Sequence, residues 1–178
     1  MRSTAHIKGH PIHPMLIPFP FAYLFGAACI DAWARASNRR DWAHTAKHMR
    51  MLGIGTALLA AVPGIIDYFT AVPPKSSAKD RATSHALCNL SALGLFAAAE
   101  AGSNGSEQPA WVVAAEAAGA ALLSAGGWMG GTLVFRNQIA VDQGVSHGLS
   151  DPRMRIDQET DHRLAAGTNR CSRKPNTM

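Results

Sequence analysis

The sequence predicts an all-α integral membrane protein, a bundle of four transmembrane helices followed by a polar C-terminal tail. The chain has 178 residues, 47% of them apolar, with 17 Lys and Arg and a formal net charge of +5. These averages are typical of a basic soluble domain, but the charges are unevenly placed. Three stretches of 26, 24 and 54 residues contain no Lys or Arg. Because a membrane helix needs about 20 residues, two stretches fit one span each and the third fits two.

The first two spans lie in the two shorter stretches. The first is expected over residues 15–36, where Asp31 is the single acid. The second is expected over residues 49–72, and from Met51 onward its one charge is Asp67. Both stretches are long enough to cross the hydrocarbon core of a bilayer.

The longest stretch divides at a polar loop that runs from Gly102 to Pro109. It therefore predicts a third span over residues 84–101 and a fourth over residues 110–135. Helices of a soluble bundle would place a charged residue on the outer face every third or fourth position. These segments do not, so membrane insertion is favoured over a soluble bundle.

The sequence also predicts domain organisation and orientation. Residues 1–142 form the membrane domain, and residues 143–178 are polar enough to be a disordered tail. With both termini in the cytoplasm, eight basic residues flank the spans on the inner side and five lie on the outer side, where positive charge is disfavoured. The inner set is Arg2, Lys8, Lys75, Lys79, Arg81, Arg136, Arg153 and Arg155, and the outer set, assigned to the first loop, is Arg35, Arg39, Arg40, Lys47 and Arg50. We expect an inner-membrane protein with cytoplasmic termini.

Ionisable residues inside a span are costly, and each indicates a partner or a function. In a four-span bundle with short loops, the start of the first and third spans and the end of the second and fourth meet at one membrane face. The polar residues at those four ends are His10, His13, Asp67, His85, Asn89 and Arg136. The sequence therefore predicts a cluster of histidines, an acid, an amide and an arginine at this face.

The three histidines are the candidate ligands or proton-relay groups. His10 and His13 alternate with prolines, so neither is expected inside a regular helix, and the stiff segment would hold both rings in place. His85 and Asn89 are four residues apart and share one helix face. Histidine is the commonest metal ligand and titrates near neutrality. The alternative is structural: His13 and the prolines cap the helix and seal the interface, and His85 with Asn89 form interhelical hydrogen bonds.

The supporting polar residues have structural interpretations as well. Asp67 is expected either to pair with Arg136 or to accept a ring N–H from one of the histidines. Asp31, Glu100 and Glu116 are expected nearer the opposite face, with Glu116 either protonated or paired with a neighbouring span. The small residues Gly126, Gly127, Gly130 and Gly131 form two overlapping pairs four apart, which predict close approach of another backbone to the fourth span.

The motifs together resemble a known family. Gly9-His10-Pro11-Ile12-His13-Pro14, Gly64-Ile65-Ile66-Asp67, His85 with Asn89, and the segment from Gly127 to Arg136 are similar to the bacterial predicted membrane proteins called domain of unknown function 2231. The resemblance covers about residues 5–142. It implies four transmembrane helices and no established activity. Fusion of some members to Rieske-type domains implies redox surroundings, although the three Cys here cannot build such a cluster.

Three function classes remain open. The first is a redox-linked membrane protein in which His10, His13 and His85 bind haem or a divalent metal, with a redox partner in the same membrane. The second is a homo-oligomeric accessory subunit that conducts protons or ions past Asp67, His85 and Glu100. The third is a structural or assembly protein whose polar cluster only holds the helices together. No nucleotide loop or nucleophile motif is present, so an enzyme is not expected; the basic residues favour the lipid bilayer over nucleic acid as a partner.

Overall fold

Four helical segments of membrane-spanning length form the fold. The computed structural model describes residues 3–39, 41–103, 109–137 and 139. The first segment joins two helices at Ile17, and each of the others is one helix. Their bounds are α1 Ile12–Leu16, α2 Pro18–Ala36, α3 Asp41–Thr70, α4 Ser77–Gly102 and α5 Ala110–Phe135. All four segments are long and apolar enough to cross a membrane, which confirms the predicted class of fold.

The predicted bounds differ from the observed ones mainly at the helix starts. The fourth span agrees at both ends, because Pro109 and Arg136 flank it. The second was predicted from residue 49, but α3 begins at Asp41, where an acid stabilises the first turn. The third was predicted from residue 84, but α4 begins at Ser77, one residue after the N-cap Ser76, which accepts the backbone N–H of Lys79. In α3 and α4 the helix therefore begins with a turn that contains charged residues, before the apolar stretch from which the span was predicted.

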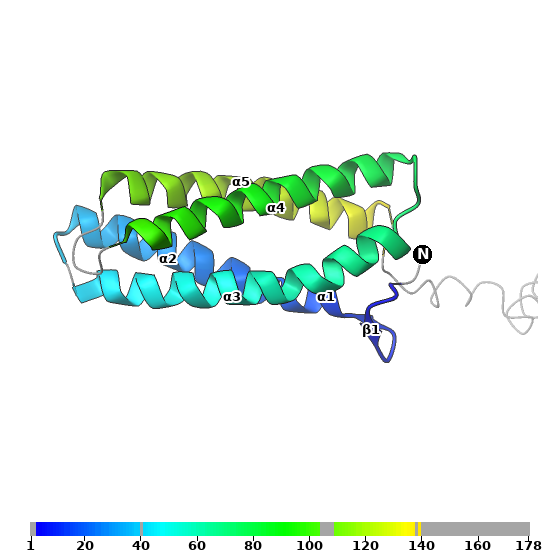
Figure 1. Cartoon of the computed structure of the whole chain (residues 1–178), viewed down its shortest axis with the longest axis horizontal. Coiled ribbons are helices and arrows are strands. Elements are labelled where there is room, and N and C mark those ends of the chain that lie inside the picture. Colours follow the sequence, from blue (N-terminus) through cyan, green and yellow to red (C-terminus); the bar gives the residue numbers. More distant parts are fainter. Residues whose placement is uncertain (1–2, 40, 104–108, 138, 140–178) are drawn as a thin grey trace, which may run out of the picture. The chain divides into compact units, whose positions relative to one another are not determined.

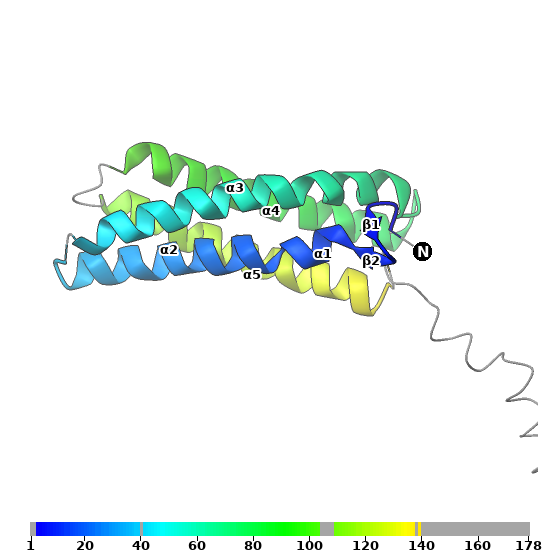
Figure 2. The same cartoon turned by 90° about the horizontal axis from the view of Figure 1, so that it is seen from below.

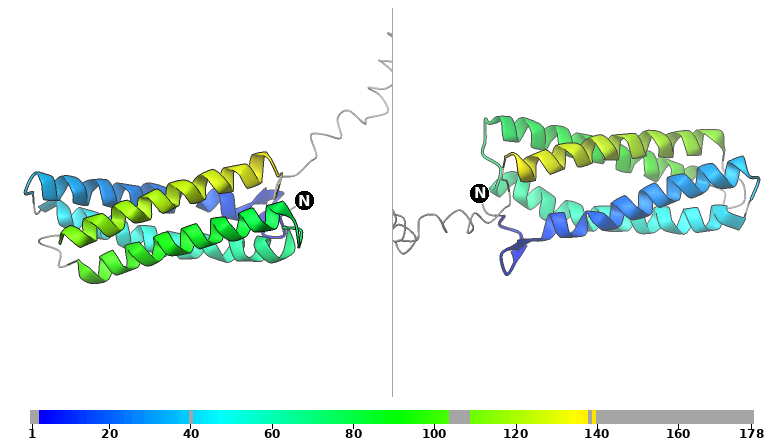
Figure 3. Two further views of the ribbon diagram at one scale, coloured as in Figure 1. Left: turned by 90° about the horizontal axis from the view of Figure 1, so that it is seen from above. Right: turned by 180° about the vertical axis from the view of Figure 1, so that it is seen from behind.

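The helices pair into two antiparallel hairpins that pack against each other. α2 packs chiefly against α3, and α4 packs chiefly against α5 (Figure 1). Contacts of α3 with α4 and of α2 with α5 close the bundle (Figure 2). The α2–α3 and α4–α5 turns lie at one end, and the α3–α4 turn lies at the other end with the N-terminal segment (Figure 3).

A short β-hairpin precedes the first helix. Strands β1 (His6–Ile7) and β2 (His10–Pro11) are antiparallel, and the turn between them places Lys8 and Gly9 at positive φ. Glycine adopts that backbone conformation without strain. The hairpin lies at the end of the bundle that holds the start of α1.

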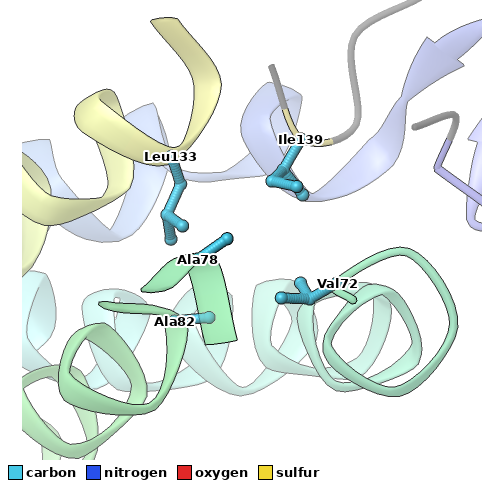
Figure 4. Packing of buried hydrophobic residues seen from close by; sticks show 5 residues of the cluster. All are labelled: Val72, Ala78, Ala82, Leu133 and Ile139. Carbon is cyan, nitrogen blue, oxygen red and sulfur yellow. The ribbon is translucent and has the colours of Figure 1, made fainter. Parts of the chain in front are cut away.

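Two groups of buried apolar residues form the core. One group lies at the end of the bundle near the α3–α4 turn and consists of Val72, Ala78, Ala82, Leu133 and Ile139 (Figure 4). The other lies in the middle of the bundle and is called the apolar layer below. It consists of Leu24, Ala92, Phe96 and Leu123. The first group joins α4 and α5 to Val72, which follows α3, and the apolar layer joins α2 of one hairpin to α4 and α5 of the other.

The outward surface of the helices is apolar, whereas charged groups lie inside. Large side chains such as Leu59, Phe69 and Leu90 are more than half exposed, while Asp31 and Arg50 are completely buried. A water-soluble protein would expose the charges and bury the large apolar side chains. This distribution is the one expected of helices surrounded by lipid.

The predicted disordered tail, residues 143–178, falls outside the described residues, so that part of the domain prediction stays a prediction.

Candidate functional site

Two histidines from different hairpins meet near one end of the bundle. The rings of His13 on α1 and His85 on α4 are nearly perpendicular, with centroids 6.4 Å apart. Both side chains are half-buried. Together with Asn89 they are called the imidazole layer below. The predicted meeting of the first and third spans at this face is therefore confirmed for two of the three histidines.

Each ring is held by a backbone carbonyl of a neighbouring helix. His13 Nδ1 lies 2.7 Å from the carbonyl oxygen of Ala60 on α3. His85 Nδ1 lies 2.7 Å from the carbonyl oxygen of Gly126 on α5. A carbonyl oxygen can only accept, so Nδ1 carries the proton in both rings. In the neutral form, each Nε2 then holds the lone pair that could bind a metal.

Sequence features of the helices explain why these carbonyls and rings can meet. Pro63 lies inside α3, where its missing N–H and its ring weaken the ladder around the carbonyls one turn earlier. Ala60 is three residues before Pro63, and its carbonyl accepts from His13. One turn on from Ala60 is Gly64, where an added Cβ would lie 2.8 Å from His13 Nδ1. Proline leaves the carbonyl of Leu59, the residue before Ala60, without its helical N–H, and glycine makes room for the ring.

The glycine pairs on α5 admit side chains of neighbouring helices. An added Cβ at Gly126 would lie 2.8 Å from Asn89 Oδ1, and one at Gly130 would lie 2.9 Å from His85 Cε1. At Gly127 it would meet the ring of Phe21, and at Gly131 it would meet nothing within 4 Å. Polar and aromatic side chains of α2 and α4 thus occupy the space beside Gly126, Gly127 and Gly130, and the close approach of another backbone stays a prediction.

Asn89 lies against the face of the His85 ring. Its amide nitrogen is 3.3 Å from Nδ1 and 3.1 Å from Nε2, and it donates to the backbone carbonyl of His85 at 2.9 Å. A donor in line with one ring nitrogen would be distinctly farther from the other. The near-equal distances therefore leave the in-plane lone pair of His85 Nε2 unused by Asn89.

The remaining predicted site residues lie apart from the two rings. His10 is exposed on β2, and Arg136 is exposed at the end of α5. The prediction that His13 lies outside regular helix is wrong, because α1 begins at Ile12 and includes it. Proline in the first turn of a helix is tolerated, which lets α1 begin before Pro14.

Asp67 binds the N-terminal segment rather than Arg136 or a histidine. Its two carboxylate oxygens accept from the Ser3 hydroxyl at 2.7 and 2.8 Å. The backbone N–H groups of Thr4 and Ala5 donate to the same carboxylate at 3.2 and 3.4 Å. Asp67 thus fastens the segment before β1 onto the end of α3, and the predicted pairing is wrong.

A second polar group lies at the opposite end of the bundle. Each long helix supplies one ionisable side chain to it: Asp31 from α2, Arg50 from α3, Glu100 from α4 and Glu116 from α5. These four residues are called the charged layer below. Arg50 Nη1 donates to Asp31 at 2.7 Å and also to Glu116, while Nε donates to Glu100 at 2.8 Å. One guanidinium therefore connects all four long helices.

The charged layer corrects the assignment of the first loop. Arg50 was expected in that loop, but it lies within α3 and is completely buried, as are Asp31 and Glu116. Lys47 also lies on α3, 3.9 Å from Glu100. The prediction that Glu116 pairs with a neighbouring span is confirmed. Its partner was missed because Arg50 stands at the edge of an apolar stretch and looked like an interfacial anchor.

One signal in the sequence pointed to Arg50. The spans contain three carboxylates near one face, and buried carboxylates require a cation. Arg35 and Arg50 are the two basic residues that directly border an apolar stretch on that side, and in the structure Arg50 contacts all three carboxylates.

The described part of the chain contains no group of three or more His, Cys, Asp or Glu side chains arranged to hold a metal ion. The three-histidine set of His10, His13 and His85 thus reduces to a pair in this structure.

Comparison with known proteins agrees with this architecture. A family model described as "Predicted membrane protein (DUF2231)" matches residues 9–143. The chain belongs to this family. The matched region of this DUF2231 protein includes all four long segments and both polar layers. No curated protein and no solved structure gives a significant match.

Proposed function

We propose that this multi-pass membrane protein binds haem between His13 and His85 and serves a redox-linked role. The observation that carries the proposal is the pair of rings at a centroid distance of 6.4 Å, each with Nδ1 bonded to a backbone carbonyl at 2.7 Å. A ligating histidine commonly donates its other ring N–H to a carbonyl, which fixes the ring and exposes Nε2 to the metal.

The ring separation would allow His13 and His85 to hold one haem iron between them. Metal–nitrogen bonds of about 2.0 Å, with each nitrogen about 1.1 Å from its ring centroid, give roughly 6 Å between the centroids of opposed imidazoles. The porphyrin supplies four further nitrogens, so two protein ligands suffice. A bare metal ion would need three or four protein ligands, and the described residues offer no such group. Haem is therefore favoured over a divalent metal.

The membrane setting supports a partner that exchanges electrons in the plane of the bilayer. The polar pair lies near one end of the bundle, within reach of a protein docked at that membrane face. We propose a redox protein of the same membrane as this partner.

We also propose the inner membrane as the location, with both termini in the cytoplasm. Burial of Arg50 removes one basic residue from the outer set. Four outer residues then oppose eight inner ones, so the positive-inside rule favours this orientation more clearly than the sequence count alone.

Haem binding is tested by absorption spectroscopy on the full chain in detergent. We expect a Soret band after reconstitution with haemin, at about one haem per chain, and loss of the band in His13→Gln and His85→Gln. His10→Gln is the matched control, because His10 belongs to the same motif but is exposed on β2. Absence of a Soret band, or equal binding by all four proteins, would overturn the proposal. Elemental analysis of the protein as purified would reveal a divalent metal instead.

A structural role is the second candidate, and the charged layer favours it. Arg50 contacts carboxylates from three other helices, and His13 and His85 each connect two helices. If the histidine variants unfold while the wild-type chain binds no haem, the polar residues serve assembly alone.

Conduction through an oligomer is less well supported. The two polar layers are separated within one chain by the apolar layer that contains Phe96. Protons or ions moving along the bundle axis would have to cross it.

A further inference from the structure

The charged layer contains more acid than base. Asp31, Glu100 and Glu116 contribute three carboxylates, and Arg50 contributes one guanidinium. Lys47 adds one ammonium group, 3.9 Å from Glu100, at a point where both side chains are partly exposed. If Lys47 balances Glu100, Arg50 balances only one of the two remaining carboxylates. Among these five groups, three negative charges therefore face two positive charges.

The position of the excess negative charge makes it costly. The side chains of Asp31 and Glu116 are completely buried. Asp31 lies five residues before the end of α2, and Glu116 lies six residues after the start of α5. At a rise of about 1.5 Å per residue, both lie roughly 7–9 Å inside the helix ends. An ionised carboxylate without a counter-charge is strongly disfavoured at such a site.

Unpaired atoms indicate what the site lacks. Asp31 Oδ1, Glu116 Oε2 and Arg50 Nη2 are buried and have no hydrogen-bond partner among the described residues. The carboxyl groups of Asp31 and Glu116 both accept from the same nitrogen, Arg50 Nη1, so they lie close together. Ionised carboxylates can only accept, so a hydrogen bond between two of them requires a proton on one. A proton would supply the missing donor and remove the excess charge.

A metal cation fits the site less well than a proton. The guanidinium of Arg50 already contacts both Asp31 and Glu116 through its Nη1 atom. A cation bound by the same carboxylates would lie close to that positive charge. A proton adds no comparable repulsion, and close carboxyl pairs commonly share one.

We propose that Asp31 and Glu116 form a buried proton-binding site that holds one proton between them at neutral pH. Glu100 gives this site its connection to water, because it contacts Arg50 at 2.8 Å while its side chain is 23% exposed. The charged groups that face the pair through printed contacts are Arg50 on α3, which contacts both acids, and Glu100 on α4, which contacts Arg50 and Lys47. The proton exchanges with the aqueous phase on the side of the α2–α3 and α4–α5 turns.

The proposal does not depend on haem. The charged layer and the imidazole layer are separated by ten residues on α3, from Arg50 to Ala60, or about 15 Å. Loss of haem binding would therefore leave the proton site unchanged, and the two proposals fail separately.

Infrared difference spectroscopy of the full chain in detergent tests the site. We expect wild-type protein at neutral pH to show a protonated-carboxyl C=O band equal to one group per chain, which shifts after labelling with ¹³C-Asp and ¹³C-Glu. The band disappears in Glu116→Gln and in Asp31→Asn. Asp41→Asn, which alters an exposed acid on α3, keeps it. The carboxamide of Glu116→Gln replaces the protonated acid, so this variant should remain folded.

Two outcomes would overturn the proposal. One is the absence of the labelled band from the wild-type protein at neutral pH, a result that requires no variant to fold. The other is loss of the band on addition of Na⁺ but not of a bulky organic cation at equal ionic strength, which would assign the site to an alkali metal ion.

Discussion

At the end of the bundle near the α2–α3 turn, one arginine contacts acids from three other helices. At the other end, two imidazole rings donate to backbone carbonyls. The charged layer depends on side-chain partners that must all be present together. The imidazole layer depends on carbonyl acceptors that every helix carries, and Gly64 and Gly130 leave room for the rings to reach them.

This difference determines how each end can evolve or change its ligand. Removing one member of a buried ionic group leaves an uncompensated charge, so the charged layer tolerates substitution poorly. A histidine whose Nδ1 donates to a carbonyl keeps Nε2 available. The imidazole layer can therefore bind a metal through Nε2 and keep the Nδ1 hydrogen bonds that connect its helices. The apolar layer between them keeps the two kinds of chemistry apart.

The largest effect is expected from Arg50→Gln. Glutamine is neutral, so it leaves buried Asp31 and Glu116 without a cation. We expect the free energy of unfolding to fall by about 3–5 kcal/mol, measured by SDS-induced unfolding in detergent micelles. Arg39→Gln is the control, since its ion pair with Asp41 is largely exposed and its loss should cost less than about 1 kcal/mol. Equal effects of the two variants would show that the charged layer does not stabilise the bundle.

The second-largest effect is expected from filling the space beside the His85 ring in the imidazole layer. Gly130→Ala would place a methyl group 2.9 Å from His85 Cε1, so the ring must move away from the carbonyl of Gly126. We expect a loss of about 1–3 kcal/mol in unfolding free energy.

Gly131→Ala is the matched control for that substitution. It lies on the next residue of α5, where an added Cβ meets nothing within 4 Å. Alanine favours helix over glycine by roughly 0.5–1 kcal/mol, so this variant should be as stable as the wild type or more so. A destabilisation equal to that of Gly130→Ala would contradict the proposed role of the glycine.

The four spans and the meeting of His13 with His85 could be predicted from the sequence. The four spans follow from where Lys and Arg are absent, and the fourth span was placed at both ends because Pro109 and Arg136 mark them. The meeting of His13 and His85 followed from topology alone, since the first and third spans begin at the same face.

Partners distant in the sequence could not be predicted in the same way. Arg50 is 19, 50 and 66 residues from its three acidic partners, and nothing in its neighbourhood distinguishes it from an interfacial anchor. Asp67 binds Ser3, 64 residues away, in a segment without a helical or strand pattern. Such contacts depend on the rotation of each helix about its axis, which the weak amphipathicity of uniformly apolar spans does not fix.

A smaller effect is expected from removing one hydrogen bond of the imidazole layer. His85→Leu keeps an apolar side chain between the hairpins but loses the 2.7 Å bond to Gly126. Interhelical hydrogen bonds in membranes contribute roughly 0.6–2 kcal/mol, so we expect a loss of about 1 kcal/mol in the same unfolding assay. A loss of unfolding free energy as large as that of Arg50→Gln would contradict the expectation that the charged layer tolerates substitution less well than the imidazole layer.

The smallest expected effect is the coupling between the two ends. Variants more than about 7–10 Å apart with no shared partner usually add within about 0.5 kcal/mol, and the two layers are separated by Leu24, Ala92, Phe96 and Leu123. We therefore expect the double variant His85→Leu with Glu100→Gln to lose the sum of the two single losses. The measurement is a double-mutant cycle of unfolding free energies in one detergent at one pH. A coupling above about 1 kcal/mol would show that the apolar layer transmits changes between the imidazole layer and the charged layer.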